Sequence, residues 1–551
     1  MTIAAAAVSM TAAAQPAITG ALNTASYIVR GLPNSGLAQG SMIAIFGRNI
    51  GPAAIAQAGS FPLPTTLGGS SARITAAGQN FDLFLTYSIA TQIGAIIPSN
   101  VPVGNATLTV SFGGQTSTSI PVEIVQSQLG IFTINQAGSG PAVVQNVNSE
   151  TDRPINTILA SARPNQAMIL WGTGLGPIQG SDAQSPPVGD LNQPIEVLVG
   201  GRRANVLYKG RSGCCAAIDQ IVFEVPGGVS GCYVPLVVKN GNRVSNYTSI
   251  AVAPTGGRCS DPFGFTAAEL SAIEASGRIR FGSVNLTRLA SKINLMGIAL
   301  DSTTDAVDAA FIEFNQQHIL ASRGPGGNAV TVGACTLFTY SGASTSSIDP
   351  ILPRVLDAGP SIMIAGPKGS KPVAKGQGGY YSSVFANATS SSGIPGLPPG
   401  FPGPPVGSDA PYLDAGSYTA TGPGGADVGS FSSQLNVPGN FRWTNEASIT
   451  DINRANDLPI TWTGAGGNDY VSISGGSSDT TARAGASFVC LERGSAGQLT
   501  VPSAILLGLP ASIAGNLSVG ITTEPVRFNA TGIDFGTFSY NSMQGKTVTV
   551  R

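Results

Sequence analysis

The chain has 551 residues, only 10% of them charged, and its formal net charge is −1. The 72 glycines and 38 prolines beside 42% hydrophobic residues predict many short strands joined by turns, and exclude a disordered chain or a mainly helical protein. Lys and Arg form no basic stripe, so we expect no binding to nucleic acid.

The chain begins with a segment, residues 1–16, that is interpreted as a truncated signal peptide. An apolar run precedes Ala12-Ala13-Ala14, which fits a small-residue cleavage site, although the positively charged start of a signal peptide is missing. No later stretch is apolar for 18 residues, so we expect no transmembrane segment. These features predict a secreted or cell-surface protein.

Two patterns in the N-terminal half occur twice in the same order. Residues 42–52 and 167–177 both contain an apolar strand, an aromatic residue, a glycine and a closing Gly-Pro. Residues 92–98 and 220–226 form the second matching pair, at nearly the same offset. A repeat of this length predicts a duplicated domain, which we place at residues 17–126 and 127–255.

Each predicted repeat contains a clear β-hairpin. In the first, residues 106–112 and 116–124 alternate on either side of Gly113-Gly114; in the second, residues 233–239 and 244–252 flank a turn at 240–242. Asn-Gly between alternating strands is a strong hairpin signal. Repeat size and turn spacing are typical of an immunoglobulin-like (Ig-like) sandwich. We therefore predict an all-β chain with two tandem Ig-like sandwiches and a larger β-rich, sandwich-like C-terminal domain.

The N-terminal half resembles a family of bacterial secreted and surface proteins with tandem IPT/TIG-like domains. The resemblance covers roughly residues 17–255 and is carried by Asn23 to Ser26, Gly40 to Gly47, Leu63 to Gly69 and Gly130 to Thr133, with Gly172 to Pro177 and Val197 to Gly201 in the second repeat. The resemblance implies an Ig-like fold and assigns no activity. The C-terminal region resembles the uncharacterised β-rich domain that accompanies such repeats.

The C-terminal region, residues 256–551, is predicted to contain one short helix and many strands. Thr266 as N-cap and Glu269 as the third helical residue predict a helix within 265–277. Residues 458–463 and 487–490 read as strands, and residues 394–405 as a Pro-rich loop or linker. Whether this region is one domain or two stays open, although a Cys335–Cys490 bond would make it one unit.

Six cysteines indicate disulfides rather than zinc, because no Cys-x2-Cys pair exists and only one histidine is present. Adjacent side chains point to opposite faces of an extended strand. Cys214 and Cys215 are therefore expected to bond to different partners, with Cys232 and Cys259 as the local candidates in either order. Cys335 and Cys490 are left to pair with each other.

Several motifs were weighed as catalytic or metal sites, and each has a simpler structural interpretation. His318 is the single histidine and is expected in a strand, so a Ser-His-Asp triad has little support. The glycines of 172–176 are interpreted as a turn, because Pro177 follows where a dinucleotide-binding loop would open a helix. Residues 466–479 are interpreted as a strand between Gly-rich turns rather than a calcium site. We expect no catalytic residue, cofactor or metal.

Two groups of residues remain as contact or catalytic hypotheses. Asp357 and Asp414 recur in a Leu-Asp-Ala-Gly echo and would be the carboxylates of a glycan hydrolase, although Asp before Ala-Gly is also an ordinary turn former. Tyr380, Tyr381 and Trp443 are the contact aromatics, with Tyr380-Tyr381 as the expected exposed pair; Trp462 is expected in the core.

The sequence favours a non-enzymatic structural or adhesive protein at the cell surface. The Ig-like domains would act as spacers and residues 256–551 would make the contact. A carbohydrate-binding protein is the alternative, and a glycan hydrolase with an unrecognised site is the second alternative. Expected partners are an extracellular polysaccharide or other surface proteins, and self-association stays open.

Overall fold

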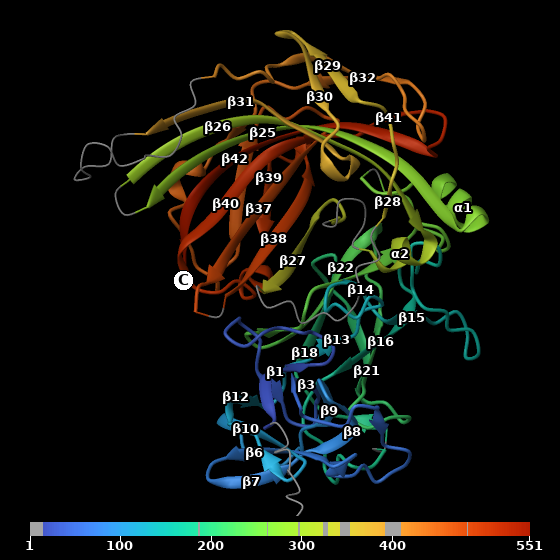
Figure 1. Cartoon of the computed structure of the whole chain (residues 1–551), viewed down its shortest axis with the longest axis vertical. Coiled ribbons are helices and arrows are strands. Elements are labelled where there is room, and N and C mark those ends of the chain that lie inside the picture. The colour runs from blue at the N-terminus through green and yellow to red at the C-terminus, as the bar shows by residue number, and fades with distance from the viewer. Residues whose placement is uncertain are drawn as a thin grey trace, which may run out of the picture.

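The computed structural model describes residues 15–185, 188–261, 263–295, 298–322, 329–341, 353–391, 409–481 and 483–551. The predicted Pro-rich segment 394–405 and nearly all of 1–16 lie outside these ranges. Two small sandwiches lie at one end of the molecule, and a large, strongly curved sheet lies at the other (Figure 1). The all-β fold class is confirmed.

The first sandwich pairs two sheets. One has the order β1 (Ala17–Asn23), β3 (Met42–Arg48), β9 (Gln92–Ile96), β8 (Phe84–Ile89) and β4 (Ala56–Gln57). The other has the order β2 (Leu37–Ala38), β12 (Ile120–Val125), β10 (Gly104–Phe112), β6 (Ser70–Ala76) and β5 (Thr66–Leu67), with β7 (Gln79–Asp82) on β6 and β11 (Gln115–Thr116) on β10. The inward residues of both sheets form one apolar core.

The second sandwich repeats this arrangement. One sheet has the order β13 (Gly130–Ile131), β16 (Ala167–Thr173), β21 (Asp219–Glu224), β20 (Asn205–Arg211) and β17 (Gly189–Asp190), with β15 (Val144–Asn146) on β16. The other has the order β14 (Gly140–Pro141), β24 (Thr248–Val252), β22 (Gly231–Asn240), β18 (Ile195–Val199) and β19 (Arg202–Arg203), with β23 (Arg243–Val244) on β22. Both predicted hairpins are present, as β10–β12 and β22–β24.

The strand register supports the predicted duplication. Phe46 of β3 lies opposite Gln92 of β9, and Trp171 of β16 lies opposite Gln220 of β21. These are the residues that the two sequence matches align with each other. In each sandwich a short strand also pairs in parallel with the last strand, as β2 with β12 and β14 with β24.

The third region is built on a sheet of eleven strands. Its order is β27 (Ala334–Ser341), β38 (Ala484–Arg493), β37 (Asp469–Asp479), β40 (Ser512–Thr523), β42 (Phe535–Val550), β25 (Arg278–Leu295), β26 (Ile298–Asn315) and β28 (Arg354–Val355). Three strands lie off this path: β31 (Tyr381–Ser391) on β26, and β35 (Asp451–Ile452) and β41 (Val526–Phe528) on β42. The predicted strand 458–463 is confirmed as β36 (Leu458–Thr463), and 487–490 as part of β38.

Two small sheets pack on one face of this large sheet, which we call the covered face. The four-stranded sheet is β30 (Gly369–Ala374), β29 (Ser361–Gly366), β32 (Gly416–Gly422) and β33 (Phe431–Val437), and it lies above β25 and β26 in Figure 1. The three-stranded sheet is β34 (Arg442–Trp443), β36 (Leu458–Thr463) and β39 (Gln498–Val501), and it packs nearer β37 and β38. Most of the apolar core of the C-terminal region lies in this layer.

Helices are few and short among the described residues. The predicted helix is confirmed as α1 (Ala267–Ser276), where Thr266 and Glu269 form a capping box. The others are α2 (Gln316–Ala321), α3 (Ser503–Leu506) and the 3-10 turns η1 (Gln377–Gly379), η2 (Glu446–Ser448) and η3 (Gly494–Ala496). No helix in the described ranges has the length and apolarity needed to cross a membrane.

The disulfides differ in part from the expectation. Cys335 and Cys490 pair as predicted, joining opposed residues of β27 and β38. Cys214 and Cys215 bond to each other, and Cys232 bonds to Cys259, so the prediction of separate partners was wrong. Adjacent side chains point to opposite faces only in an extended strand, whereas residues 212–218 form a loop. Three disulfides fit folding in an oxidising compartment.

Candidate functional site

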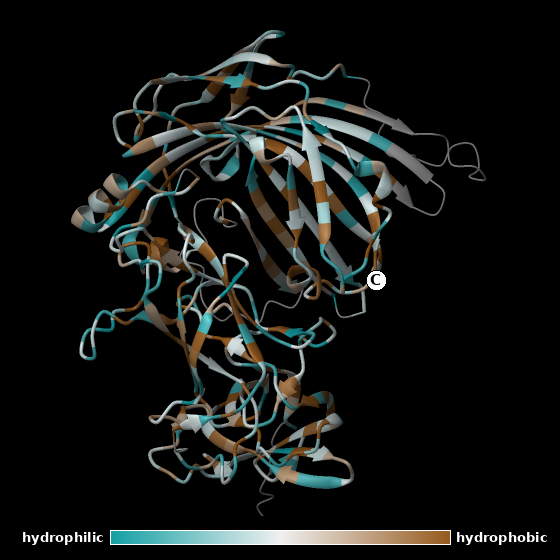
Figure 2. Cartoon of the chain, turned by 180° about the vertical axis from the view of Figure 1, so that it is seen from behind, coloured by the Kyte–Doolittle hydropathy of each residue, from teal (hydrophilic) through white to brown (hydrophobic). Residues whose placement is uncertain are grey.

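The face of the large sheet opposite the covered face is called the open face here. Because side chains alternate along a strand, Phe538 and Tyr540 of β42 enter the core while Ser539 and Asn541 point the other way. The strands of the large sheet carry alternating hydrophobic and hydrophilic bands in Figure 2. Large side chains on the open face are strongly exposed from edge to edge: Tyr340 (53%), Leu289 (44%) and Val384 (62%).

A cavity of about 330 Å³ lies at one end of the open face. Its floor is supplied by hydroxyl and amide side chains of four neighbouring strands: Ser283, Asn285, Ser472, Thr522, Thr537, Ser539 and Asn541. Its walls include Phe263, Val330, Val489 and Leu491. The volume lies at the lower end of the range, about 300–1000 Å³, that is typical of small-molecule sites.

Hydrogen bonds between neighbouring strands fix the floor. Ser539 Oγ donates to Asn285 Oδ1 at 2.7 Å, and Thr522 Oγ1 donates to Asn541 Oδ1. Each bond uses only the amide oxygen, and an asparagine also carries two N–H donors. The floor is therefore an ordered array of donors and acceptors without charge.

Arg527 is the only charged residue among the described residues that line the cavity. Its guanidinium lies 4.3 Å from the centre of the Phe535 ring, donates to Gly264 O at 3.0 Å and contacts Glu269 at 3.3 Å. Burial lowers the pKa of Arg527, and the Glu269 carboxylate opposes this shift. Arg527 therefore ties β41 to the segment before α1.

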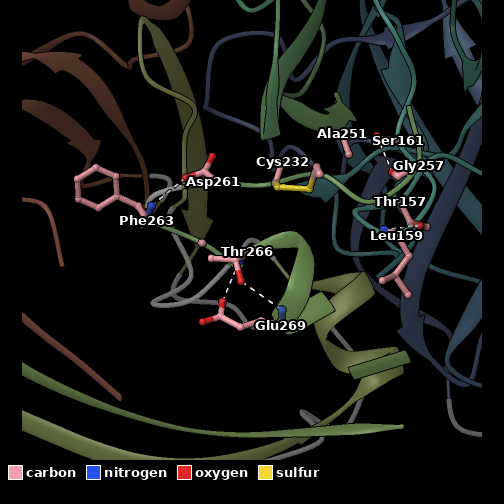
Figure 3. The surroundings of a disulfide bond; sticks show 12 residues. Thr157, Leu159, Ser161, Cys232, Ala251, Gly257, Asp261, Phe263, Thr266 and Glu269 are labelled. Atoms are coloured by element: carbon pink, nitrogen blue, oxygen red, sulfur yellow. Dashed lines mark hydrogen bonds between the residues drawn. A yellow bond between two sulfur atoms is a disulfide. The ribbon is translucent and has the colours of Figure 1, made fainter. Parts of the chain in front are cut away.

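That segment joins the second sandwich to the large sheet and closes one end of the cavity. The Cys232–Cys259 bond anchors it to β22, and Phe263 N donates to Asp261 Oδ1 at 3.0 Å (Figure 3). Phe263 then packs edge-on against Tyr470 of β37, with ring centres 4.7 Å apart. Burial raises the pKa of Asp261, and backbone N–H donors oppose the shift.

A second joint holds the two sandwiches together. Asn23 Nδ2 donates to Thr173 O at 3.1 Å, while its Oδ1 accepts from two backbone amides of its own loop. Arg211 forms a fully buried ion pair with Asp219 and donates to Gly40 O at 3.0 Å in the other sandwich. The Asn23 motif of the family resemblance therefore lies at a domain joint.

The predicted contact aromatics do not form one surface. Tyr380 is 44% exposed, but Tyr381 is 1% exposed and its hydroxyl donates to Gly359 O. The prediction of an exposed pair was wrong because successive residues face opposite ways and Tyr381 enters the core with Phe311. Trp443 is also buried, at 5%. Trp462 lies in the core as expected.

The carboxylates of the hydrolase hypothesis lie outside the cavity. Asp357 pairs with Lys375 at 2.8 Å, and Asp414 pairs with Lys368 at 2.7 Å. Asp357 Oδ1 also accepts from Gly359 N at 2.9 Å, which is the turn geometry expected of Asp before Ala-Gly.

The other motifs that could have suggested a catalytic or metal site form ordinary helices, strands or turns. His318 lies in α2 rather than in a strand, because the Asn315 side chain caps the helix by accepting from His318 N at 2.9 Å. Residues 469–479 form β37, as the strand interpretation required, and Gly174 and Gly176 have positive φ in a loop. Within the described ranges, no three His, Cys, Asp or Glu side chains gather as metal ligands.

The cavity was not predicted, although one sequence echo lies beside it. Phe281-Gly282-Ser283 lies near the start of β25 and Phe535-Gly536-Thr537 starts β42, and both lead into alternating apolar and small polar residues. The structure pairs these strands in parallel with Phe281 beside Phe535. Their rings stack with centres 5.8 Å apart. Arg527 had no comparable signal, because its role depends on the distant Gly264 and Glu269.

No family model and no curated protein matches the chain. Some solved structures do. Domains 4–9 of the surface layer protein SbsC are 11% identical over 95% of this chain and 84% of that one, with a TM-score of 0.16. SGBP-B from a xyloglucan utilization locus in Bacteroides uniformis is 10% identical over 68% and 86%, with a TM-score of 0.16.

Immunoglobulin domains 1–5 of Sidekick-1 are 11% identical over 97% of this chain and 99% of that one, with a TM-score of 0.12. These TM-scores are too low to indicate a shared overall arrangement. The IPT/TIG-like resemblance stays a prediction.

Proposed function

We propose that the chain is a secreted or cell-surface adhesive protein whose contact surface is the open face of the eleven-stranded sheet. One observation carries the proposal: the same strands are covered by two small sheets on one face and present partly exposed, uncharged polar side chains on the other. A surface that serves only solubility normally mixes both signs of charge. A wide face made mostly of uncharged side chains, with Asp308 and Arg493 as exposed exceptions, suits contact with a partner.

The contacts at the two joints favour a role for the sandwiches as a support for the large sheet. The Arg211–Asp219 pair and Asn23 connect the sandwiches to each other. The Cys232–Cys259 bond and Arg527 connect the second sandwich and its following segment to the large sheet. These contacts favour a stiff support that presents the open face at a fixed angle, rather than a flexible string of spacers.

A carbohydrate-binding protein is the second candidate, and the cavity floor of hydroxyl and amide groups favours it. We also propose that the protein is not an enzyme. The support is that the cavity is lined by Ser, Thr and Asn beside apolar residues, with Arg527 already engaged by Glu269. Asp357 and Asp414 are each held by a lysine elsewhere.

The test of the proposed function uses cells of the encoding organism and beads coated with the full chain. We expect antibodies to label intact cells, and we expect the beads to adhere to those cells or to the matrix they deposit. Placing charge on the open face by Ser518→Glu should reduce adhesion several-fold. Ser432→Glu, on the exposed side of β33, is the matched control. Protein found only inside cells, or adhesion that both variants leave unchanged, would refute the proposal.

A further inference from the structure

We infer that the cavity and the adjoining open face bind a neutral polysaccharide, with one sugar unit in the cavity and the chain continuing across β37, β40 and β42. The inference rests on the proposed function and names the class of partner. It is supported by the hydrogen-bonding array of the floor, by the absence of free charge among the described residues that line the cavity, and by the uncharged serines of β37 and β40 beside it.

The floor matches a hydroxylated ring. A sugar hydroxyl both donates and accepts, and the Ser, Thr and Asn side chains of the floor do the same. The Ser539–Asn285 and Thr522–Asn541 bonds hold two of the amides in fixed orientations. Phe263, Val489 and Leu491 supply an apolar wall for the C–H face of the ring. Polar groups that fix orientation beside apolar walls are the usual composition of a small-molecule site.

The charged groups at the cavity disfavour binding of an ionised polysaccharide. Arg527 is the single charged lining residue in the described chain, and Glu269 lies 3.3 Å from it. An anionic sugar would have to compete with Glu269 for the Arg527 guanidinium. The guanidinium also stacks on the Phe535 ring and donates a hydrogen bond to Gly264 O. A cationic sugar would find no carboxylate among the lining residues. The site is therefore suited to an uncharged ligand.

The open face beyond the cavity carries further uncharged groups that can hydrogen-bond to a polymer. Gly520 of β40 lies opposite Ser472 and Met543, and Gly545 of β42 lies opposite Ser518. Both glycines are buried: a Cβ at Gly520 would meet Met543, and one at Gly545 would meet Ser518 Oγ, so neighbouring residues of the sheet fill these places. Ser474 and Ser518 lie opposite each other on the open face and are partly exposed. The same uncharged chemistry thus extends from the cavity across three strands.

The experiment measures retention of the full chain on insoluble cellulose, chitin, mannan and starch, with alginate beads as the anionic comparison. Ser472→Phe fills the cavity from its floor, and Ser432→Phe on β33 is the matched control of equal bulk on an exposed position. Asn541→Ala is a milder second variant that removes the amide without adding bulk. Circular dichroism and thermal unfolding check that each variant is folded.

We expect at least one neutral polysaccharide to retain the wild type and the control, largely independent of salt. Ser472→Phe should weaken retention at least tenfold and Asn541→Ala severalfold. Retention on alginate alone, retention on no polysaccharide, or equal retention of all variants would overturn the inference. Surface labelling with bead adhesion in such a case would leave the adhesive function standing with another partner, whereas intracellular protein would remove both.

Discussion

The two faces of the eleven-stranded sheet are made by the same strands and have opposite character. On the covered face, Phe538 and Tyr540 of β42 pack with residues of the four-stranded sheet. On the open face, Ser539 and Asn541 of the same strand line a cavity. The comparison shows that the two small sheets bury the apolar side chains of one face only. The other face combines uncharged polar side chains with exposed apolar ones such as Leu289 and Val384, which suits a neutral partner that both hydrogen-bonds and packs against apolar groups.

The largest loss of stability is expected from truncating a side chain that is buried on the covered face. Phe538→Ala removes a fully buried ring and should destabilise the C-terminal region by about 3–5 kcal/mol. Ser539→Ala, one residue along the strand, removes one hydrogen bond to Asn285 and should cost only about 1 kcal/mol. Urea unfolding followed by the fluorescence of the buried Trp443 and Trp462 measures both. Similar losses for the two variants would contradict the contrast between the faces.

The next largest loss of stability is expected from removing a disulfide at the edge of the large sheet. The Cys335–Cys490 bond ties β27 to β38 and closes a span of 155 residues. Replacing both cysteines by alanine should lower the unfolding free energy by about 2–5 kcal/mol. The same urea experiment, without reductant, measures the change. A loss below about 1 kcal/mol would mean that strand pairing alone holds β27 in place.

The smallest effects are two pH dependences of opposite sign. Burial disfavours ionisation of Asp305, but hydrogen bonds from Arg288, Leu413 N and Tyr412 N hold its pKa below the ordinary value of 3.8. Its stabilisation is therefore full above pH 3.8 and is lost as pH falls through the lowered pKa. Asp305→Asn should remove this loss.

Asp261, at the joint beside the cavity, should behave in the opposite way. Burial raises its pKa above 3.8, so its contribution is most favourable below pH 3.8 and declines as pH rises through the raised pKa. Relative to Asp261→Asn, the wild type should lose stability between pH 3.8 and 7. Thermal unfolding of the wild type and both variants over pH 2.5–7 measures the two slopes. Slopes of the same sign would contradict the assigned shifts.

Much of the fold could be predicted from local and repeated patterns. The hairpin turns and the Thr266–Glu269 capping box need only nearby residues and were predicted correctly. The Cys335–Cys490 pair also followed, by elimination. The error at Cys214 and Cys215 arose because a loop was read as a strand.

The candidate site could not be predicted, because it is assembled from strands far apart in the chain. Ser472, Thr522, Asn541 and Asn285 become neighbours only through the pairing of β37, β40, β42 and β25. Alternation in the sequence shows that each strand has a polar side. It does not show which strands are neighbours, and so which polar sides lie together. The exposed Tyr340 was missed for the same reason, since only the register of β27 against β38 places it on the open face.

The most direct test of the central claim is thiol labelling at two adjacent residues of β40. The wild type has no free cysteine, so Ser518→Cys reports the open face and Val519→Cys the covered face. In the folded protein we predict rapid maleimide labelling at 518, none at 519, and slower labelling at 518 when a retained neutral polysaccharide is present. Protection of both positions, or labelling at 518 that no polysaccharide slows, would contradict the claim that the open face is the contact surface.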